Sequence, residues 1–192
     1  MQNMQDITPE FIRTVQKSAK QLLSKAQIDA AFEQMATKVT ATLEYANPVI
    51  ITLMNGGLFT TSELCLRLNF PLEMDYIHAT RYDGGVTGQI LKWRKEPNTA
   101  LEGRVVLLVD DILDGGITLK HAKEYCETKG AKHVYTLALL DKVEARMPEG
   151  LAKADFTGLD IPNEYVFGYG LDYHNYLRNV PGIYAVAKEH MF

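Results

Sequence analysis

Several residue types and patterns are scarce in this chain of 192 residues. It has only two cysteines, Cys65 and Cys126, which excludes a disulfide framework and argues against a metal cage. Its five histidines show no H-x-x-x-H spacing, so nothing indicates a catalytic zinc site. No apolar run approaches the roughly 18 residues of a membrane span, and the first ten residues lack the basic and apolar blocks of a signal peptide. We therefore expect a cytoplasmic protein without a membrane partner.

The charge balance is mildly acidic. A net charge of −4 and a pI of about 5.7 argue against a broad nucleic-acid-binding face. The hydrophobic fraction of 46% is ordinary for a globular protein, and the length fits one domain. The sequence thus predicts one domain with a core that needs no covalent cross-links.

Hydrophobic periodicity predicts helices that alternate with strands. The N-terminal pattern is helical over residues 8–45, with Ser24 as a candidate N-cap and a stripe of apolar residues that favours core packing. Further helices are expected at 61–68 and 117–128, and strands at 49–54, 72–80, 105–109, 133–140, 155–158, 165–168 and 183–187. This alternation indicates an α/β fold with a central, mainly parallel sheet flanked by helices. Residues 81–97 are polar and contain glycine, and we expect them to form a long loop that acts as a lid.

The most informative segment is 104–118. Its five apolar residues, 105–109, predict a strand buried on both faces of a parallel sheet. They are followed by three carboxylates, two glycines and a threonine: Asp110, Asp111, Asp114, Gly115, Gly116 and Thr118. Ligands of open α/β sheets bind at the carboxyl ends of the strands, and a helix N-terminus there favours an anion. Because carboxylates alone would repel a phosphate, we expect a sugar phosphate that carries Mg²⁺.

Two other interpretations of this segment are an ordinary strand with an acidic turn and a Walker B strand. The second would need a G-x-x-x-x-G-K-[ST] loop elsewhere, which the sequence lacks. The order of strand, acidic pair and phosphate loop instead resembles the phosphoribosyl-pyrophosphate (PRPP) motif of the type I phosphoribosyltransferases.

The resemblance extends to the hypoxanthine-guanine phosphoribosyltransferases over about residues 49 to 186. Leu139-Leu140-Asp141-Lys142 is similar to the family strand that ends in a purine-contacting lysine. The run from Tyr165 to Tyr173 looks like the family's hood, and Arg178 matches an arginine that meets pyrophosphate. The fold implied is the type I phosphoribosyltransferase fold, with a core at about 48–145 and a small hood from 1–47 and 146–192.

The resemblance implies a purine salvage enzyme that joins the phosphoribosyl group of PRPP to N9 of hypoxanthine or guanine. The products would be IMP or GMP and pyrophosphate, Mg²⁺ would be required, and a homodimer or homotetramer is expected. Asp114 would be the general base near purine N7. Lys142 can donate to a 6-oxo group but cannot accept from a 6-amino group, which favours hypoxanthine or guanine over adenine.

The remaining site residues are also taken from the resemblance. Those of the purine pocket are Tyr165, which would stack on the base, Val166, whose carbonyl would accept from a 2-amino group, and Asp172, which would also help to hold Mg²⁺ directly or through water. Those of the PRPP pocket are Asp110 and Asp111 at the ribose hydroxyls and, through these or water, at Mg²⁺; Gly115, Gly116 and Thr118 at the 5′-phosphate; and Asn55, Gly56 and Arg178 at pyrophosphate.

Three loops depart from the family pattern, and the first is the phosphate loop, in which Gly115 and Ile117 stand where Thr and Lys are common. Asn55 stands where a lysine is usual, and a non-proline cis peptide there would lie between Met54 and Asn55. In the lid, Arg81-Tyr82 stands where Ser-Tyr is common. We hypothesise that Arg81 supplies charge that Asn55 lacks, while Tyr82 covers the reacting centre.

Two alternative functions stay open at this point. One is a xanthine-preferring relative, because xanthine also carries a 6-oxo group. The other is a PRPP-sensing regulator that binds nucleic acid, which the acidic pI disfavours.

Overall fold

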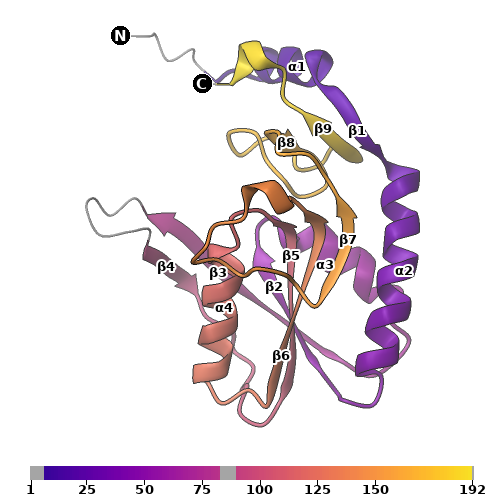
Figure 1. Ribbon diagram of the computed structural model, residues 1–192, viewed down its shortest axis with the longest axis vertical. Coiled ribbons are helices and arrows are strands. Elements are labelled where there is room, and N and C mark those ends of the chain that lie inside the picture. The colour runs from indigo at the N-terminus through magenta and orange to yellow at the C-terminus, as the bar shows by residue number, and fades with distance from the viewer. Residues whose placement is uncertain (1–6, 83–89, 192) are drawn as a thin grey trace.

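The computed structural model describes residues 7–82 and 90–191 (Figure 1). Its helices are α1 (Pro9–Ser18), α2 (Lys25–Leu43), α3 (Gly57–Cys65) and α4 (Ile117–Thr128). Its strands are β1 (Lys20–Ser24), β2 (Val49–Met54), β3 (Glu73–Tyr82), β4 (Ile90–Lys95), β5 (Val105–Leu113), β6 (His133–Asp141), β7 (Phe156–Asp160), β8 (Val166–Phe167) and β9 (Gly182–Ala185). Short 3₁₀ turns lie at Val143–Ala145 and Lys188–His190. No helix in these two ranges is long and apolar enough to cross a membrane.

The larger sheet has six strands in the order β4-β3-β2-β5-β6-β7. All neighbours in it are parallel except β3 and β4, which are antiparallel. Alternate residues of β5 point to opposite faces of this sheet. Leu107 packs in one core cluster with α2 and α3, and Leu108 packs in another with α4. Figure 1 shows the same arrangement, with α4 and α2 on opposite sides of the sheet. The predicted fold class, an α/β protein with a mainly parallel central sheet, is confirmed.

The smaller sheet joins the two ends of the chain. Its order is β1-β9-β8, with antiparallel pairs throughout. Helix α1 packs against it through Ile12 and Val15, in a cluster with Phe167 and Tyr173. Figure 1 places this sheet above the carboxyl ends of the central strands. Strand β7, by contrast, pairs with β6 in the larger sheet, although it belongs to the C-terminal segment.

The N-terminal helical pattern is interrupted by a strand that the sequence did not predict. Residues Lys20–Ser24 form β1, whose partner β9 comes from the far end of the chain. The expectation of helix over all of 8–45 is therefore wrong between α1 and α2. Ser24 nevertheless caps α2 as expected, because its hydroxyl accepts from the Gln27 N–H while the side-chain oxygen of Gln27 accepts from the Ser24 N–H.

The segment at 81–97 also differs from its prediction. Instead of a single loop, β3 continues to Tyr82 and β4 runs antiparallel to it along the sheet edge. Strand β4 was missed because a strand at the edge of a sheet needs no continuous apolar run. The backbone of Arg81 and Tyr82 lies in β3, but their side chains are outside the described residues, so the lid prediction concerns atoms that the structure does not describe.

Element boundaries agree best where an apolar run ends sharply. Strand β2 and helix α4 span the predicted residues. Helix α3 begins four residues before its predicted start and ends at Cys65. Strand β5 continues to Leu113, so the acidic pair lies on the strand and not in a loop after it.

Candidate active site

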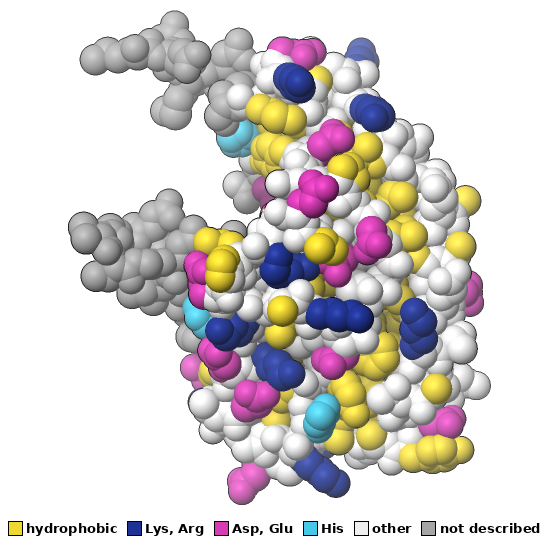
Figure 2. Space-filling view, in the orientation of Figure 1, with side chains coloured by type: hydrophobic (Ala, Val, Ile, Leu, Met, Phe, Trp, Pro, Cys, Tyr) yellow, Lys and Arg dark blue, Asp and Glu magenta, His cyan; other side chains and the backbone are white. Residues whose placement is uncertain are grey.

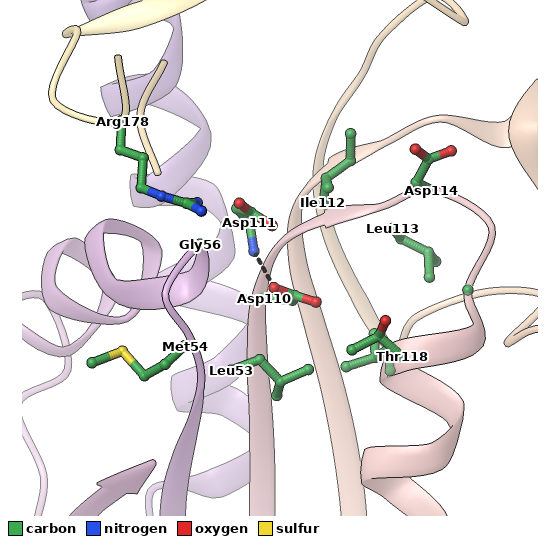
Figure 3. A pocket seen from close by; sticks show the side chains of 12 residues that line it. Leu53, Met54, Gly56, Asp110, Asp111, Ile112, Leu113, Asp114, Thr118 and Arg178 are labelled. Atoms are coloured by element: carbon green, nitrogen blue, oxygen red, sulfur yellow. Dashed lines mark hydrogen bonds between the residues drawn. The ribbon is translucent and has the colours of Figure 1, made fainter. Parts of the chain in front are cut away.

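Two pockets share a wall at the carboxyl ends of β5 and β6. The first, of about 210 Å³, is called the phosphate pocket here (Figure 3). It is lined by Leu53, Met54, Gly56, Asp110, Asp111, Ile112, Leu113, Asp114, Gly116, Thr118, Leu119 and Arg178. These residues come from three separate parts of the chain: the end of β2 with the turn after it, the end of β5 with the turn into α4, and the segment between β8 and β9.

The acidic pair on β5 points in two directions. Figure 3 shows the Asp111 side chain on the side of Gly56 and Arg178, and Asp110 on the side of Thr118. The backbone N–H of Asp111 donates to Oδ1 of Asp110 at 3.0 Å. Asp111 is only 8% exposed, and this burial raises the pKa of its carboxyl above the ordinary value, while the positive charge of Arg178 works in the opposite direction.

Gly56 allows the chain between β2 and α3 to pass beside Asp111. A Cβ at this position would lie 2.5 Å from Cγ of Asp111 and would overlap its carboxylate. Gly170 approaches the same loop, and with φ of +107° an added Cβ would overlap the Gly56 carbonyl. The peptide bond between Met54 and Asn55 is cis, as the family resemblance predicted.

The turn after β5 leads directly into α4. Gly116 has φ of +83°, and a Cβ on it would lie 2.6 Å from the Leu151 carbonyl. Helix α4 begins one residue later with no acidic side chain in its first turn. The partial positive charge of this helix end therefore faces the phosphate pocket without a carboxylate from the helix to neutralise it.

The second pocket, of about 250 Å³, is called the purine pocket here. It is lined by Asp111, Ile112, Asp114, Lys142, Tyr165, Val166, Leu171 and Asp172. Nζ of Lys142 lies 3.4 Å from Oδ2 of Asp114. The lysine side chain is 8% exposed and the aspartate 43%, so one partner is buried and the other reaches solvent.

The roof of the purine pocket comes from the segment around the smaller sheet. Tyr165 is 42% exposed, and its ring centroid lies 5.7 Å from that of Tyr173. Burial, then the nearby charge of Asp172, raises the pKa of the Tyr165 phenol, which therefore stays protonated at neutral pH. An uncharged aromatic ring is thus part of the pocket lining.

Arg178 connects the two pockets. Its Nη2 lies 2.7 Å from Oδ1 of Asp172, and its Nη1 donates to the Gly170 carbonyl at 2.6 Å. The other oxygen of Asp172 accepts from the Asn175 N–H at 2.8 Å. A cation at the phosphate pocket is therefore tied to a carboxylate at the purine pocket.

Most of the predicted site residues lie in one of these pockets, but some do not. Asn55 is exposed and Gly115 lies in the turn, and neither is among the residues that line the two pockets. Sequence reasoning also missed two residues beside the site, Arg146 and Asp141. Arg146 donates to the main-chain oxygen of Asp114 and pairs with the Asp141 carboxylate. An arginine four residues after Lys142 carried no signal to distinguish it from a surface residue.

The carboxylates fit a magnesium ion that takes few ligands from the protein. Within the described ranges, no three His, Cys, Asp or Glu side chains gather as a metal cluster. Mg²⁺ keeps several waters and binds through one or two carboxylates plus substrate phosphates. Asp110, Asp111 and Asp172 offer oxygen donors of this kind at the two pockets.

An open α/β sheet with an acidic pair and a glycine turn at a helix N-terminus, under a small antiparallel sheet, defines a phosphoribosyltransferase. The phosphoribosyl transferase domain family matches residues 18–174. A hypoxanthine-guanine phosphoribosyltransferase of Lactococcus lactis is 36% identical over 172 residues, covering 88% of this chain and 92% of the relative. The chain belongs to the hypoxanthine-guanine phosphoribosyltransferase family.

Solved structures agree with this assignment. A hypoxanthine phosphoribosyltransferase of Staphylococcus aureus matches with a TM-score of 0.84 and 26% identity, over 96% of this chain and 98% of that one. A hypoxanthine-guanine-xanthine phosphoribosyltransferase matches with a TM-score of 0.79 and 30% identity, over 88% and 97%. The likeness therefore covers nearly the whole length of both chains.

Proposed function

We propose that the chain transfers the phosphoribosyl group of PRPP to N9 of hypoxanthine or guanine and releases pyrophosphate. The observation that carries this proposal is the Lys142–Asp114 pair in the purine pocket, because Asp114 also lines the phosphate pocket. A base held there would meet the anomeric carbon of a sugar phosphate held next door. The products are IMP from hypoxanthine and GMP from guanine.

The purine pocket recognises a 6-oxo base through Lys142. A lysine ammonium donates hydrogen bonds and accepts none, so it matches a carbonyl and not the amino group of adenine. Asp114 accepts the proton at N7 as a general base, a role worth about 10²–10⁴-fold in rate. Tyr165 stacks on the base, and the Val166 carbonyl accepts from a 2-amino group.

The phosphate pocket and the turns beside it hold the three parts of PRPP: the 5′-phosphate, the ribose and the pyrophosphate. The turn Gly115-Gly116 and Thr118 bind the 5′-phosphate at the N-terminus of α4. Asp110 and Asp111 accept hydrogen bonds from the ribose hydroxyls. Asn55, Gly56 and Arg178 bind the pyrophosphate; Arg178 donates to it as negative charge develops in the transition state. Arg81 and Tyr82 close over the centre and exclude water.

Magnesium is the implied cofactor of this reaction. Asp110 and Asp111, through ribose hydroxyls or water, and Asp172, directly or through water, would hold it. When bound, the ion neutralises the charge of the departing pyrophosphate. The residues named above keep their roles in binding and orienting both substrates.

Xanthine is the alternative substrate that the pocket makes less favourable. Its 2-oxo group is an acceptor, and the Val166 carbonyl that we place against the 2-substituent is also an acceptor. A 2-amino group, or a hydrogen, avoids that repulsion. We therefore place guanine and hypoxanthine ahead of xanthine.

A nucleic-acid-binding regulator is disfavoured by charge. On the face seen in Figure 2, Lys and Arg side chains are interspersed with Asp and Glu. The net charge is −4. Phosphate contacts need a concentration of basic residues, and the acidic total offers no excess of them. The homodimer or homotetramer and the cytoplasmic location stay predictions; sedimentation velocity checks the first.

The test offers hypoxanthine, guanine, xanthine and adenine separately to the purified protein with Mg²⁺ and PRPP. We expect nucleotide from hypoxanthine and guanine, none from adenine, and loss of activity when EDTA removes the metal. Asp114→Asn should lower kcat by about 10²-fold or more, whereas the exposed Asp160→Asn should leave it unchanged. Activity with xanthine above the other bases would support the alternative. No turnover with any base would contradict the proposal.

A further inference from the structure

Arg146 makes three contacts that no role in the proposed mechanism uses. Its Nη1 donates to the Asp114 carbonyl, its Nη2 pairs with Oδ1 of Asp141, and its Nε donates to the Ala152 carbonyl at 3.2 Å. The arginine side chain is only 13% exposed, and that of Asp141 10%. A planar guanidinium that is nearly buried and donates to three oxygen acceptors has little freedom to move.

The segment around Arg146 is bound along its length to the turn that carries Asp114. The Met147 N–H donates to the Gly115 carbonyl at 3.1 Å, and the Leu151 N–H donates to the Gly116 carbonyl at 3.0 Å. Gly150 passes so close that an added Cβ would overlap the Gly115 carbonyl. The loop after β6 therefore holds the loop after β5 from one side.

The other side of that turn is the ion pair with Lys142. The Asp114 carboxylate is 43% exposed, and within the described part of the chain it pairs with one side-chain group, Nζ of Lys142, at 3.4 Å. A single contact of this length does not fix an aspartate rotamer. The position of the carboxylate therefore depends on the position of its own backbone, which Arg146 holds.

We propose that Arg146, anchored by Asp141, is a positioning residue that sets the Asp114 carboxylate for proton transfer without touching the purine. This inference rests on the proposed function of Asp114. Misplacement of a catalytic group by about 1 Å can cost roughly 10²-fold in rate. Loss of Arg146 should thus act on kcat, because the PRPP contacts are made by other residues.

The chain offers a matched control at the opposite end of the sheet. Arg104 also joins a carboxylate and a main-chain carbonyl: its Nη1 lies 2.9 Å from Glu73, and its Nη2 donates to the Asn47 carbonyl at 3.1 Å. It precedes β5, whereas the site follows β5. Arg104→Met removes a similar set of bonds far from the pockets and should change stability without changing kcat.

The experiment measures kcat and KM for Arg146→Met alone and in an Asp114→Asn background. Alone, the change should lower kcat about 10- to 100-fold and leave KM for PRPP within about twofold. In the Asp114→Asn background its effect should shrink below about threefold, because the positioned group is already lost. Arg146→Lys keeps the positive charge but loses the planar set of donors of the guanidinium, so it should recover part of kcat. It also keeps the test usable if Arg146→Met does not fold.

Hydrogen exchange of residues 112–114, the backbone around Asp114, gives a readout independent of turnover. Arg146→Met, or Arg146→Lys in its place, should speed exchange there, and Arg104→Met should not. An unchanged kcat in the folded variants, an equal loss in both backgrounds, or unchanged exchange would overturn the inference. If the wild type itself turned over no purine, the proposed function would fail, and the exchange experiment would still decide whether Arg146 holds the turn.

Discussion

Lys142 and Asp114 meet because they are the first residues after two paired strand ends. Leu113 of β5 lies opposite Asp141 of β6, and the Lys142 N–H donates to the Leu113 carbonyl at 3.0 Å. The strands are parallel, so both side chains emerge at the same edge of the sheet. The 3.4 Å ion pair is therefore a product of register, and a shift of either strand by one residue would separate the two groups.

Replacing Lys142 tests this pair directly. Lys142→Met keeps the length of the buried stem and removes the donor to a 6-oxo group. A hydrogen bond to a charged group is worth about 1.5–3 kcal/mol, so we expect KM for hypoxanthine to rise about 10- to 100-fold while KM for PRPP stays within about twofold. Steady-state kinetics with each substrate varied in turn measures both values.

The control for this change is Lys132→Met. Lys132 is exposed and precedes β6 at the other end of the strand. It should keep wild-type kinetics. If Lys142→Met raised KM for hypoxanthine and KM for PRPP equally, the lysine would support the fold of the site and would not recognise the base.

Gly56 is expected to be intolerant of any side chain. In Gly56→Ala the new Cβ would lie 2.5 Å from Cγ of Asp111, which is buried and cannot swing away freely. Overpacking of this kind costs about 1–3 kcal/mol of stability. Because the displaced carboxylate lines both pockets, kcat/KM for PRPP should also fall, by about 10²-fold or more.

Thermal unfolding and PRPP kinetics together check this prediction. Gly103→Ala serves as control, because Gly103 has φ of +70° but nothing lies within 4 Å of an added Cβ. It should lose stability through backbone strain and keep its activity. Normal PRPP kinetics in Gly56→Ala would contradict the proposed close packing of Gly56 on Asp111.

The parts of the fold that could be predicted are those fixed by local pattern. Strand β2 is a closed apolar run, and α4 begins after a glycine turn and ends near Gly130, so their bounds follow from neighbouring residues. Ser24 was found because a capping box depends on residues three apart. In each case the deciding interaction is short in sequence.

The parts that were missed depend on distant partners. Strand β1 has an exposed start, and it becomes a strand only because β9, about 160 positions later in the chain, pairs with it. Strand β5 continues through two aspartates because β6 pairs with it beyond the apolar run. Arg146 acts through the Asp114 carbonyl, and a contact with backbone leaves no mark on the sequence of the other partner.

The cap at Ser24 should contribute to stability and not to catalysis. Ser24→Ala removes the hydroxyl that accepts from the Gln27 N–H at the start of α2, a loss of about 0.5–2 kcal/mol, while the backbone N–H of residue 24 can still donate to the Gln27 side chain. Urea unfolding should show a lower midpoint with an unchanged slope. Ser62→Ala, at an exposed position inside α3, should be neutral or slightly stabilising. A change in KM for either substrate in Ser24→Ala would mean that α2 influences the site.

The two thiols should be unreactive in the native protein. Burial raises the pKa of Cys65 from 9.0 to about 11, and burial aided by Glu127 raises that of Cys126 from 9.0 to about 12. The thiolate is the reactive species, so at pH 8 a disulfide reagent such as Ellman's reagent should modify neither cysteine until the chain unfolds. Cys65, which is partly exposed and has the lower pKa, should react first as pH rises.

The same shifts predict how stability changes in alkali. A folded pKa above the unfolded value means that the native state holds the proton more tightly, so this contribution is complete below pH 9 and is lost as pH rises through about 11 and 12. Lysines and tyrosines titrate in the same range, so the comparison must be with a variant that lacks the group. Above pH 9 the free energy of unfolding should fall less steeply with pH in Cys126→Ala than in the wild type. Parallel curves for the two proteins would mean that the buried thiol ionises as readily in the folded chain as in the unfolded one.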